Sequence, residues 1–193
     1  MRSIARFTAL IATLWFMPPL AQTASATTAL YLSEVEHAAA SDAVVLATIG
    51  AQRTDRDPNS GRLFTHSVVH VDKAVFGDAP AAFEVHQMGG RMGDEVQYIP
   101  GDARLQTGER VLLFVRKVDD QWYLTALEQS KYSVVPSLDG TLLERELHGG
   151  LFLRSKGGAM TPWVDDTEGS PMTLDRLVWI FADAGLAPVG GEQ

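Results

Sequence analysis

Apolar residues along the middle of the chain form unbroken runs or alternate with polar ones, and both patterns are typical of β-strands. The run AVVLATI at Ala43–Ile49 is rich in β-branched residues and predicts a central strand, and Arg110–Val118 predicts a second strong one. Strand-like patterns also occur at Leu63–Phe76, Ala82–Met88, Trp122–Leu127, Lys131–Pro136 and Thr141–Leu147.

Short segments rich in turn residues separate these predicted strands. Thr54–Gly61 has the composition of a hairpin loop, residues 77–80 that of a turn, and residues 119–121 that of a tight hairpin. Because turns rather than helices join the strands, an antiparallel sheet is favoured over a parallel α/β sheet. The prediction is a mainly β fold, a small antiparallel barrel or sandwich, of which the barrel form removes exposed edges.

Helical periodicity is confined to the two sides of this β-rich block. Residues 27–42 predict a short N-terminal helix, in which Ser33 and Glu36 have the spacing of a capping box. From about Leu174 to Ala184, apolar residues at i, i+3, i+4 and i+7 predict an amphipathic C-terminal helix with Thr173 as its N-cap. The Gly- and Pro-rich stretch before it has no clear pattern.

The first 26 residues have the pattern of a secretory signal peptide. Arg2 and Arg6 form a positive n-region, and Phe7–Met17 is an uncharged run too short to span a bilayer. Residues 24–26 (ASA) supply the small side chains of a cleavage site. We therefore expect an exported protein, either periplasmic or secreted.

Removal of this leader would leave residues 27–193, which suit a single barrel-like domain with its core at residues 41–147. The formal net charge would change from −8 to −10, because the leader carries two arginines and no acid. Such an acidic surface repels phosphate groups, so nucleic acid is not an expected partner. No second apolar stretch approaches the roughly 18 residues of a spanning helix, so no membrane span is expected after cleavage.

The chain contains no cysteine. This excludes disulfides, thiolate metal sites, cysteine nucleophiles and lipid attachment through cysteine. An exported domain without disulfides must rely on its core, which fits a bacterial envelope protein better than an animal extracellular one.

Several segments together resemble an uncharacterised family of secreted bacterial β-rich proteins. These segments are SDAVVLATIG (41–50), VHVDKAVFG (69–77), MGGRMGD (88–94), TGERVLLFV (107–115) and YLTALEQSKYSV (123–134). The layout is also similar to netrin-like and tissue-inhibitor-of-metalloproteinase domains, over roughly residues 33–135, which implies an OB-like barrel. Those inhibitors present an N-terminal cysteine to the protease zinc. This chain has no cysteine, so the resemblance implies neither that mechanism nor any functional residue.

Polar residues on two predicted strands form a candidate metal site. His70 and Asp72 have the same parity on the long strand, so they face one side about 7 Å apart. Pairing with the next strand around the turn brings His86 beside them. His70, Asp72 and His86 are the candidate ligands, and the alternative is a solvated face that tolerates them. His66 lies about 13 Å from His70 along the strand, too far to share an ion with it.

Gly89, Gly90 and Arg91 form a candidate binding loop. Glycine amides can converge on an anion, to which Arg91 would add a charge. The alternative is a wide turn in which glycine supplies a positive φ.

No convergent catalytic set is predicted. Asp165, Asp166 and Glu168 lie near a tryptophan, as in some sugar hydrolases, or form a solvated acidic loop. No HExxH or GxSxG motif occurs. Trp122 and Trp179 are expected in the core.

These patterns favour an exported, non-catalytic binding protein whose partner is another envelope or secreted protein. Two alternatives stay open, a metal-dependent hydrolase that uses the histidine-bearing face and a structural component of the envelope. No cofactor is predicted, and the sequence does not indicate an oligomeric state.

Overall fold

The computed structural model describes residues 27–138, 140–145, 147, 150–156, 158–163 and 172–186. In chain order the elements are β1 (Thr27–Leu30), α1 (Glu34–Ala39), β2 (Ala43–Arg56), β3 (Leu63–Gly77), β4 (Ala82–Met88), β5 (Gly90–Met92), β6 (Glu95–Gln97), β7 (Arg110–Val118), β8 (Gln121–Leu124), the 3-10 helix η1 (Leu127–Ser130), β9 (Lys131–Ser137), β10 (Gly140–Glu144), β11 (Gly150–Lys156), β12 (Ala159–Pro162) and α2 (Leu174–Asp183). The predicted mainly β class with two flanking helices is confirmed. The predicted leader and the acidic group Asp165, Asp166 and Glu168 lie outside the described residues.

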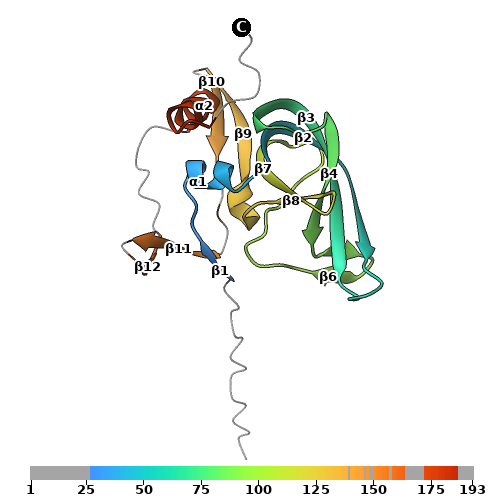
Figure 1. Cartoon of the computed structure of the whole chain (residues 1–193). Helices are drawn as coiled ribbons and strands as arrows, with labels where there is room; N and C mark the ends of the chain where they lie inside the picture. The colour runs from blue at the N-terminus through green and yellow to red at the C-terminus, as the bar shows by residue number, and fades with distance from the viewer. Residues whose placement is uncertain are drawn as a thin grey trace, which may run out of the picture.

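Five strands close into a ring. Their order is β7-β2-β3-β4-β8, and β8 pairs again with β7. Neighbouring strands are antiparallel except β4 and β8, which are joined by the parallel pair Val85 and Trp122. Figure 1 shows β9 and β10 extending the sheet from β7, outside the ring. Closure pairs strand edges that an open sheet would expose.

The first half of β2, residues 43–49, and the middle of β7, residues 111–115, are buried on both faces. Alternate residues, such as Val45 and Leu113, point into the ring and pack with Trp122 in an inner core. The residues between them, such as Val44 and Phe114, pack outside the ring in a second core with α1 and α2. Two-sided burial explains the unbroken apolar runs, because a strand with one solvated face would alternate.

The helix predicted at residues 27–42 is wrong in its first part. Residues Thr27–Leu30 form β1, which pairs in parallel with β11 from near the other end of the chain. A local pattern cannot reveal so distant a partner. The capping box is confirmed, because the Ser33 amide donates to Glu36 Oε2 at 2.9 Å and the Glu36 amide to Ser33 Oγ at 3.4 Å.

The helix α2 covers the outer core. Leu177 and Phe181 are fully buried, and Thr173 Oγ1 caps the helix by accepting a backbone amide. Trp122 is buried as expected, but the core position expected for Trp179 is wrong, since it is 64% exposed. Two residues turn a helix by about 200°, so Trp179 lies opposite Leu177. Within the described ranges, no helix has the length and apolar character to cross a bilayer.

The weakly patterned segment between β4 and β7 forms the short β5–β6 hairpin and an irregular stretch. Ala103 and Leu105 of that stretch belong to the inner core. Figure 1 shows β6 at the lower end of the ring. The segment is therefore anchored inside the ring, and it positions the first candidate site.

Candidate binding groove and histidine cluster

Gly89 and Gly90 lie where β4 gives way to β5, and the backbone needs glycine at both positions. Their φ angles are 92° and 135°, which side chains disfavour. A Cβ at Gly89 would stand 2.6 Å from the Gln97 carbonyl oxygen, and one at Gly90 would overlap Thr65 Oγ1. The Gly89 amide donates to the Leu63 carbonyl at 2.7 Å. That amide therefore donates within the protein and is not available to bind an anion.

The three predicted binding residues nevertheless line one groove. Gly89, Gly90 and Arg91 border a hollow of about 310 Å³ at this end of the ring. The Arg91 side chain is exposed, and its Nε donates to the Gly93 carbonyl at 3.3 Å. The structure thus brings these residues together as the wall of a groove.

The same groove has an apolar rim. Met88, Val96 and Tyr98 all line it and are 41%, 59% and 55% exposed. Single exposed apolar side chains are ordinary, but a group of them in one hollow is typical of a binding surface. Among the described residues, β6 pairs with β5 alone, so its other edge has no strand beside it.

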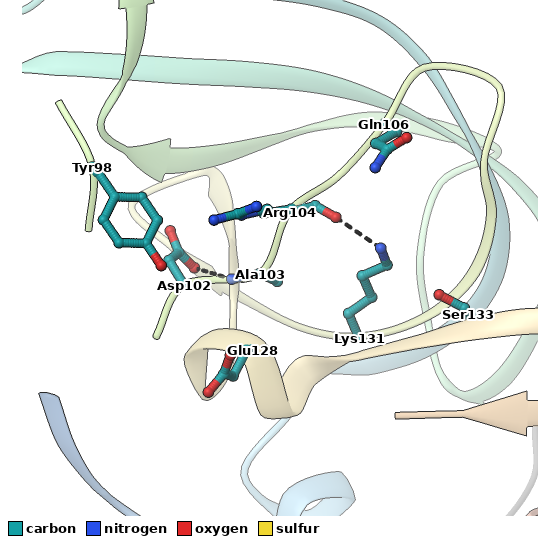
Figure 2. A pocket seen from close by; sticks show the side chains of 8 residues that line it. All are labelled: Tyr98, Asp102, Ala103, Arg104, Gln106, Glu128, Lys131 and Ser133. Atoms are coloured by element: carbon teal, nitrogen blue, oxygen red, sulfur yellow. Dashed lines mark hydrogen bonds between the residues drawn. The ribbon is translucent and has the colours of Figure 1, made fainter. Parts of the chain in front are cut away.

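A second hollow of about 160 Å³ adjoins the groove and shares Tyr98, Asp102, Ala103 and Arg104 with it (Figure 2). The Arg104 guanidinium lies 5.5 Å from the centre of the Tyr98 ring. Lys131 Nζ donates to the Arg104 carbonyl at 2.7 Å. Figure 2 shows the side chain of Lys131 rising from β9 toward that carbonyl. These contacts hold the segment after β6 in place beside β9.

Two carboxyl groups, Asp102 and Glu128, line this second hollow. Burial raises the pKa of Asp102, and the charge of Glu128 raises it further, although the Ala103 amide donates to Asp102 at 2.9 Å. A carboxyl group with a raised pKa in a hollow is a frequent feature of ligand sites. The sequence did not reveal this pair, because the two residues are separated in the chain and only folding buries them together.

A group of histidine and glutamate side chains forms the second candidate site. The β3–β4 register sets His66 directly opposite His86, with Glu84 two residues before His86 on the same face. One ligand atom from each of the three lies within 4.8 Å of the others. Val85, between Glu84 and His86, points into the inner core, so the group lies on the outer face of the ring.

Hydrogen bonds and ion pairs order this histidine cluster. His66 Nε2 lies 3.0 Å from Asp55 Oδ1, while its Nδ1 is buried without a partner. Arg53 pairs with Asp55 and, at 3.1 Å, with Glu84. Burial lowers the pKa of His86, and the neighbouring His66 lowers it further. A neutral imidazole leaves one nitrogen lone pair free to bind a ligand.

Of the predicted metal candidates, only His86 belongs to this group. His70 lies opposite Ala82 and packs against Gly50. Asp72 accepts from Arg110 Nε at 3.3 Å. The structure therefore does not bring His70 and Asp72 to His86, and His66 and Glu84 stand in their place.

The chain matches no protein-family model, and no curated protein or solved structure matches it either. A function must therefore be inferred from the geometry of these two sites.

Proposed function

We propose that this protein is an exported bacterial, non-catalytic binding protein that holds an extended segment of another envelope or secreted protein. The observation that carries the proposal is the groove bordered by Gly89, Gly90 and Arg91, which has an exposed apolar rim and is lined in part by β6, a strand with one edge unpaired among the described residues.

The edge of β6 favours an extended occupant. A peptide that adds a strand to a free edge gains main-chain hydrogen bonds, and its alternate side chains find pockets. Beside this edge, Val96 and Tyr98 offer apolar surface, and Met88 offers a flexible side chain that adapts to different partners. Arg91 and Arg104 line the same groove. The chemistry thus fits a segment with apolar side chains and an acidic group among them.

We also propose that the ring is an OB-type barrel, as the resemblance of residues 33–135 implies. The closed five-stranded order with one parallel pair supports this assignment. Such barrels bind ligands on the face of their second and third strands, which here are β3 and β4. The outer face of these two strands carries His66, Glu84 and His86, while Thr65 of β3 and Gln87 of β4, which alternate with them, line the groove.

A displayed library of random linear peptides, selected on the purified protein, tests this function. We expect selected peptides to share spaced apolar residues and to shift the backbone amide resonances of residues 88–98. Val96→Asp should weaken the binding of a selected peptide at least ~10-fold, or about 1.4 kcal/mol, because it puts a charge on the apolar rim.

The matched control is Met160→Asp, since Met160 is 58% exposed on β12, in a different sheet. This variant should bind the peptide as the unchanged chain does. The proposal fails if no peptide is selected, or if both variants bind with equal affinity.

A further inference from the structure

We propose that His66, Glu84 and His86, on the outer face of β3 and β4, bind one divalent transition-metal ion of the zinc type. The site does not depend on the function proposed for the groove. Within the part of the chain that the structure describes, it is the one group of three such side chains whose ligand atoms lie this close together.

The spacing of the three side chains fits one ion. With bonds of about 2.0–2.2 Å, ligand atoms around a tetrahedral zinc stand about 3.4 Å apart. The ligand atoms here lie within 4.8 Å of one another. Side-chain rotations that move them by about an ångström would therefore bring them to tetrahedral spacing. The backbone supplies the rest, because His66 and His86 are a directly opposed pair on adjacent strands.

A hydrogen-bond partner orients the ring of His66. A carboxylate only accepts hydrogen bonds, so the contact of Asp55 Oδ1 with His66 Nε2, at 3.0 Å, places the proton on Nε2. In a neutral ring the lone pair is then on Nδ1, which is buried without a partner. A metal-binding histidine commonly gives its other N–H to a carboxylate, which orients the ring. Asp55 is therefore a positioning residue for His66.

The positive charge of Arg53 lies beside the carboxylates of this cluster. Arg53 pairs with both Asp55 and Glu84, and its side chain is 55% exposed. Exposed ion pairs contribute little to stability, so Arg53 can be released from Glu84 at a small cost in free energy. A bound divalent ion would take the place of the Arg53 guanidinium beside the Glu84 carboxylate.

The donor set selects the type of ion. Two imidazoles and one carboxylate suit zinc and other late transition metals, whereas calcium and magnesium require oxygen ligands. A hollow of about 250 Å³ beside the histidines is lined also by Phe64, Gln121 and Tyr123. Three protein ligands beside an open hollow leave a fourth position for water or for a group of another molecule.

Zinc chloride titrated calorimetrically into the purified chain, made without a histidine tag, tests the site. We expect one zinc ion per chain, and a visible spectrum of tetrahedral geometry with cobalt(II). Glu84→Gln and His86→Ala should each lower the affinity for zinc more than about 100-fold. This exceeds the effect of losing a residue that only hydrogen-bonds to a ligand. Both residues are partly exposed, so the variants should fold, which circular dichroism checks.

The matched control is His70→Ala, an exposed histidine on β3, the strand that carries His66, and on the same face. It should leave zinc affinity unchanged. The proposal is overturned if the unchanged chain binds no zinc, if Glu84→Gln and His86→Ala bind as tightly as it does, or if His70→Ala loses as much affinity as His86→Ala.

Two further variants separate this arrangement from adventitious binding to a surface histidine. Asp55→Asn should weaken zinc about 10- to 100-fold, because the amide no longer fixes the His66 tautomer. Arg53→Ala should strengthen zinc binding, because it removes the competing cation. Unchanged affinity in both variants would contradict the roles assigned to Asp55 and Arg53 and leave a surface histidine as the explanation.

Discussion

Burial separates structural histidines from histidines that are open to a ligand. His37 is fully buried, stacks on Phe114 with ring centres 4.1 Å apart, and lies with Nε2 3.2 Å from Ser130 Oγ. Burial lowers the pKa of His37 to about 3, and the charge of Arg145 contributes. His37 therefore stays neutral in the folded protein and belongs to the outer core.

This lowered pKa predicts a loss of stability in acid. The unfolded chain protonates His37 below pH 6.5, whereas the folded chain does so only near pH 3. The unfolded state thus binds more protons in that window, so the free energy of unfolding falls as the pH falls. The loss from this one group is on the order of 5 kcal/mol across the window.

Urea unfolding of the unchanged chain and of His37→Phe, measured from pH 7 to pH 3.5, isolates this contribution. The phenylalanine retains the stacking on Phe114 but cannot titrate, so its unfolding free energy should depend less steeply on pH. Parallel pH profiles for the two proteins would show that His37 does not cause the dependence.

At the scale of elements, the register of β3 and β4 decides which side chains meet. A hairpin closed tightly around residues 77–80 would set His86 opposite Val71, between His70 and Asp72. In the structure β4 begins at Ala82, opposite His70, and His86 faces His66. Beyond Val71, β3 continues along β2 without β4, and register shifts interrupt that pairing. Bulges of this kind leave no reliable sign in strand periodicity.

The end of β3 carries a second prediction. Gly77 has a φ of 67°, and a Cβ there would overlap the carbonyl oxygen of Asp42. Gly61 has nearly the same φ, 69°, but nothing lies within 4 Å of its Cβ position. Gly61→Ala should therefore cost only the left-handed backbone, about 1–2 kcal/mol. Gly77→Ala should cost several kcal/mol, because backbone must move as well.

Urea denaturation of the two alanine variants measures this difference directly. Since the φ angles of the two glycines match, the excess loss in Gly77→Ala reports the close approach of β3 to the residue before β2. Equal losses would mean that this approach does not constrain the fold.

At the scale of the whole molecule, one outer core joins the two ends of the described chain to the ring. Ala38 of α1 and Phe181 of α2 pack with Phe114 and Leu112 of β7. Figure 1 shows both helices on the same side of the molecule, near β9 and β10. The C-terminal helix therefore completes the fold rather than forming an appendage.

Two substitutions in α2 test this packing. Phe181→Ala should destabilise the protein by about 3–5 kcal/mol, because it opens a cavity in the outer core. Trp179→Ala, on the exposed face of the same helix, should change stability by about 0.5 kcal/mol or less. Thermal unfolding monitored by circular dichroism compares them, and similar melting temperatures for the two variants would refute the assignment of faces.

The sequence by itself determined the β-rich class, most strand positions, the capping box at Ser33 and the buried face of α2. These features follow from local periodicity and from residues a few positions apart, which interact whatever the rest of the chain does. It also marked Gly89, Gly90 and Arg91, because glycine at a strand end is a local signal. In each case the physical cause lies within one segment.

Only the tertiary structure decided that β8 closes the ring, that β1 pairs with β11, and that His66 and Glu84 rather than His70 and Asp72 lie beside His86. Each of these depends on pairing between separate segments, where a shift in register changes every partner. The sequence determined which side chains could meet on the outer face of the ring, and the register determined which of them do.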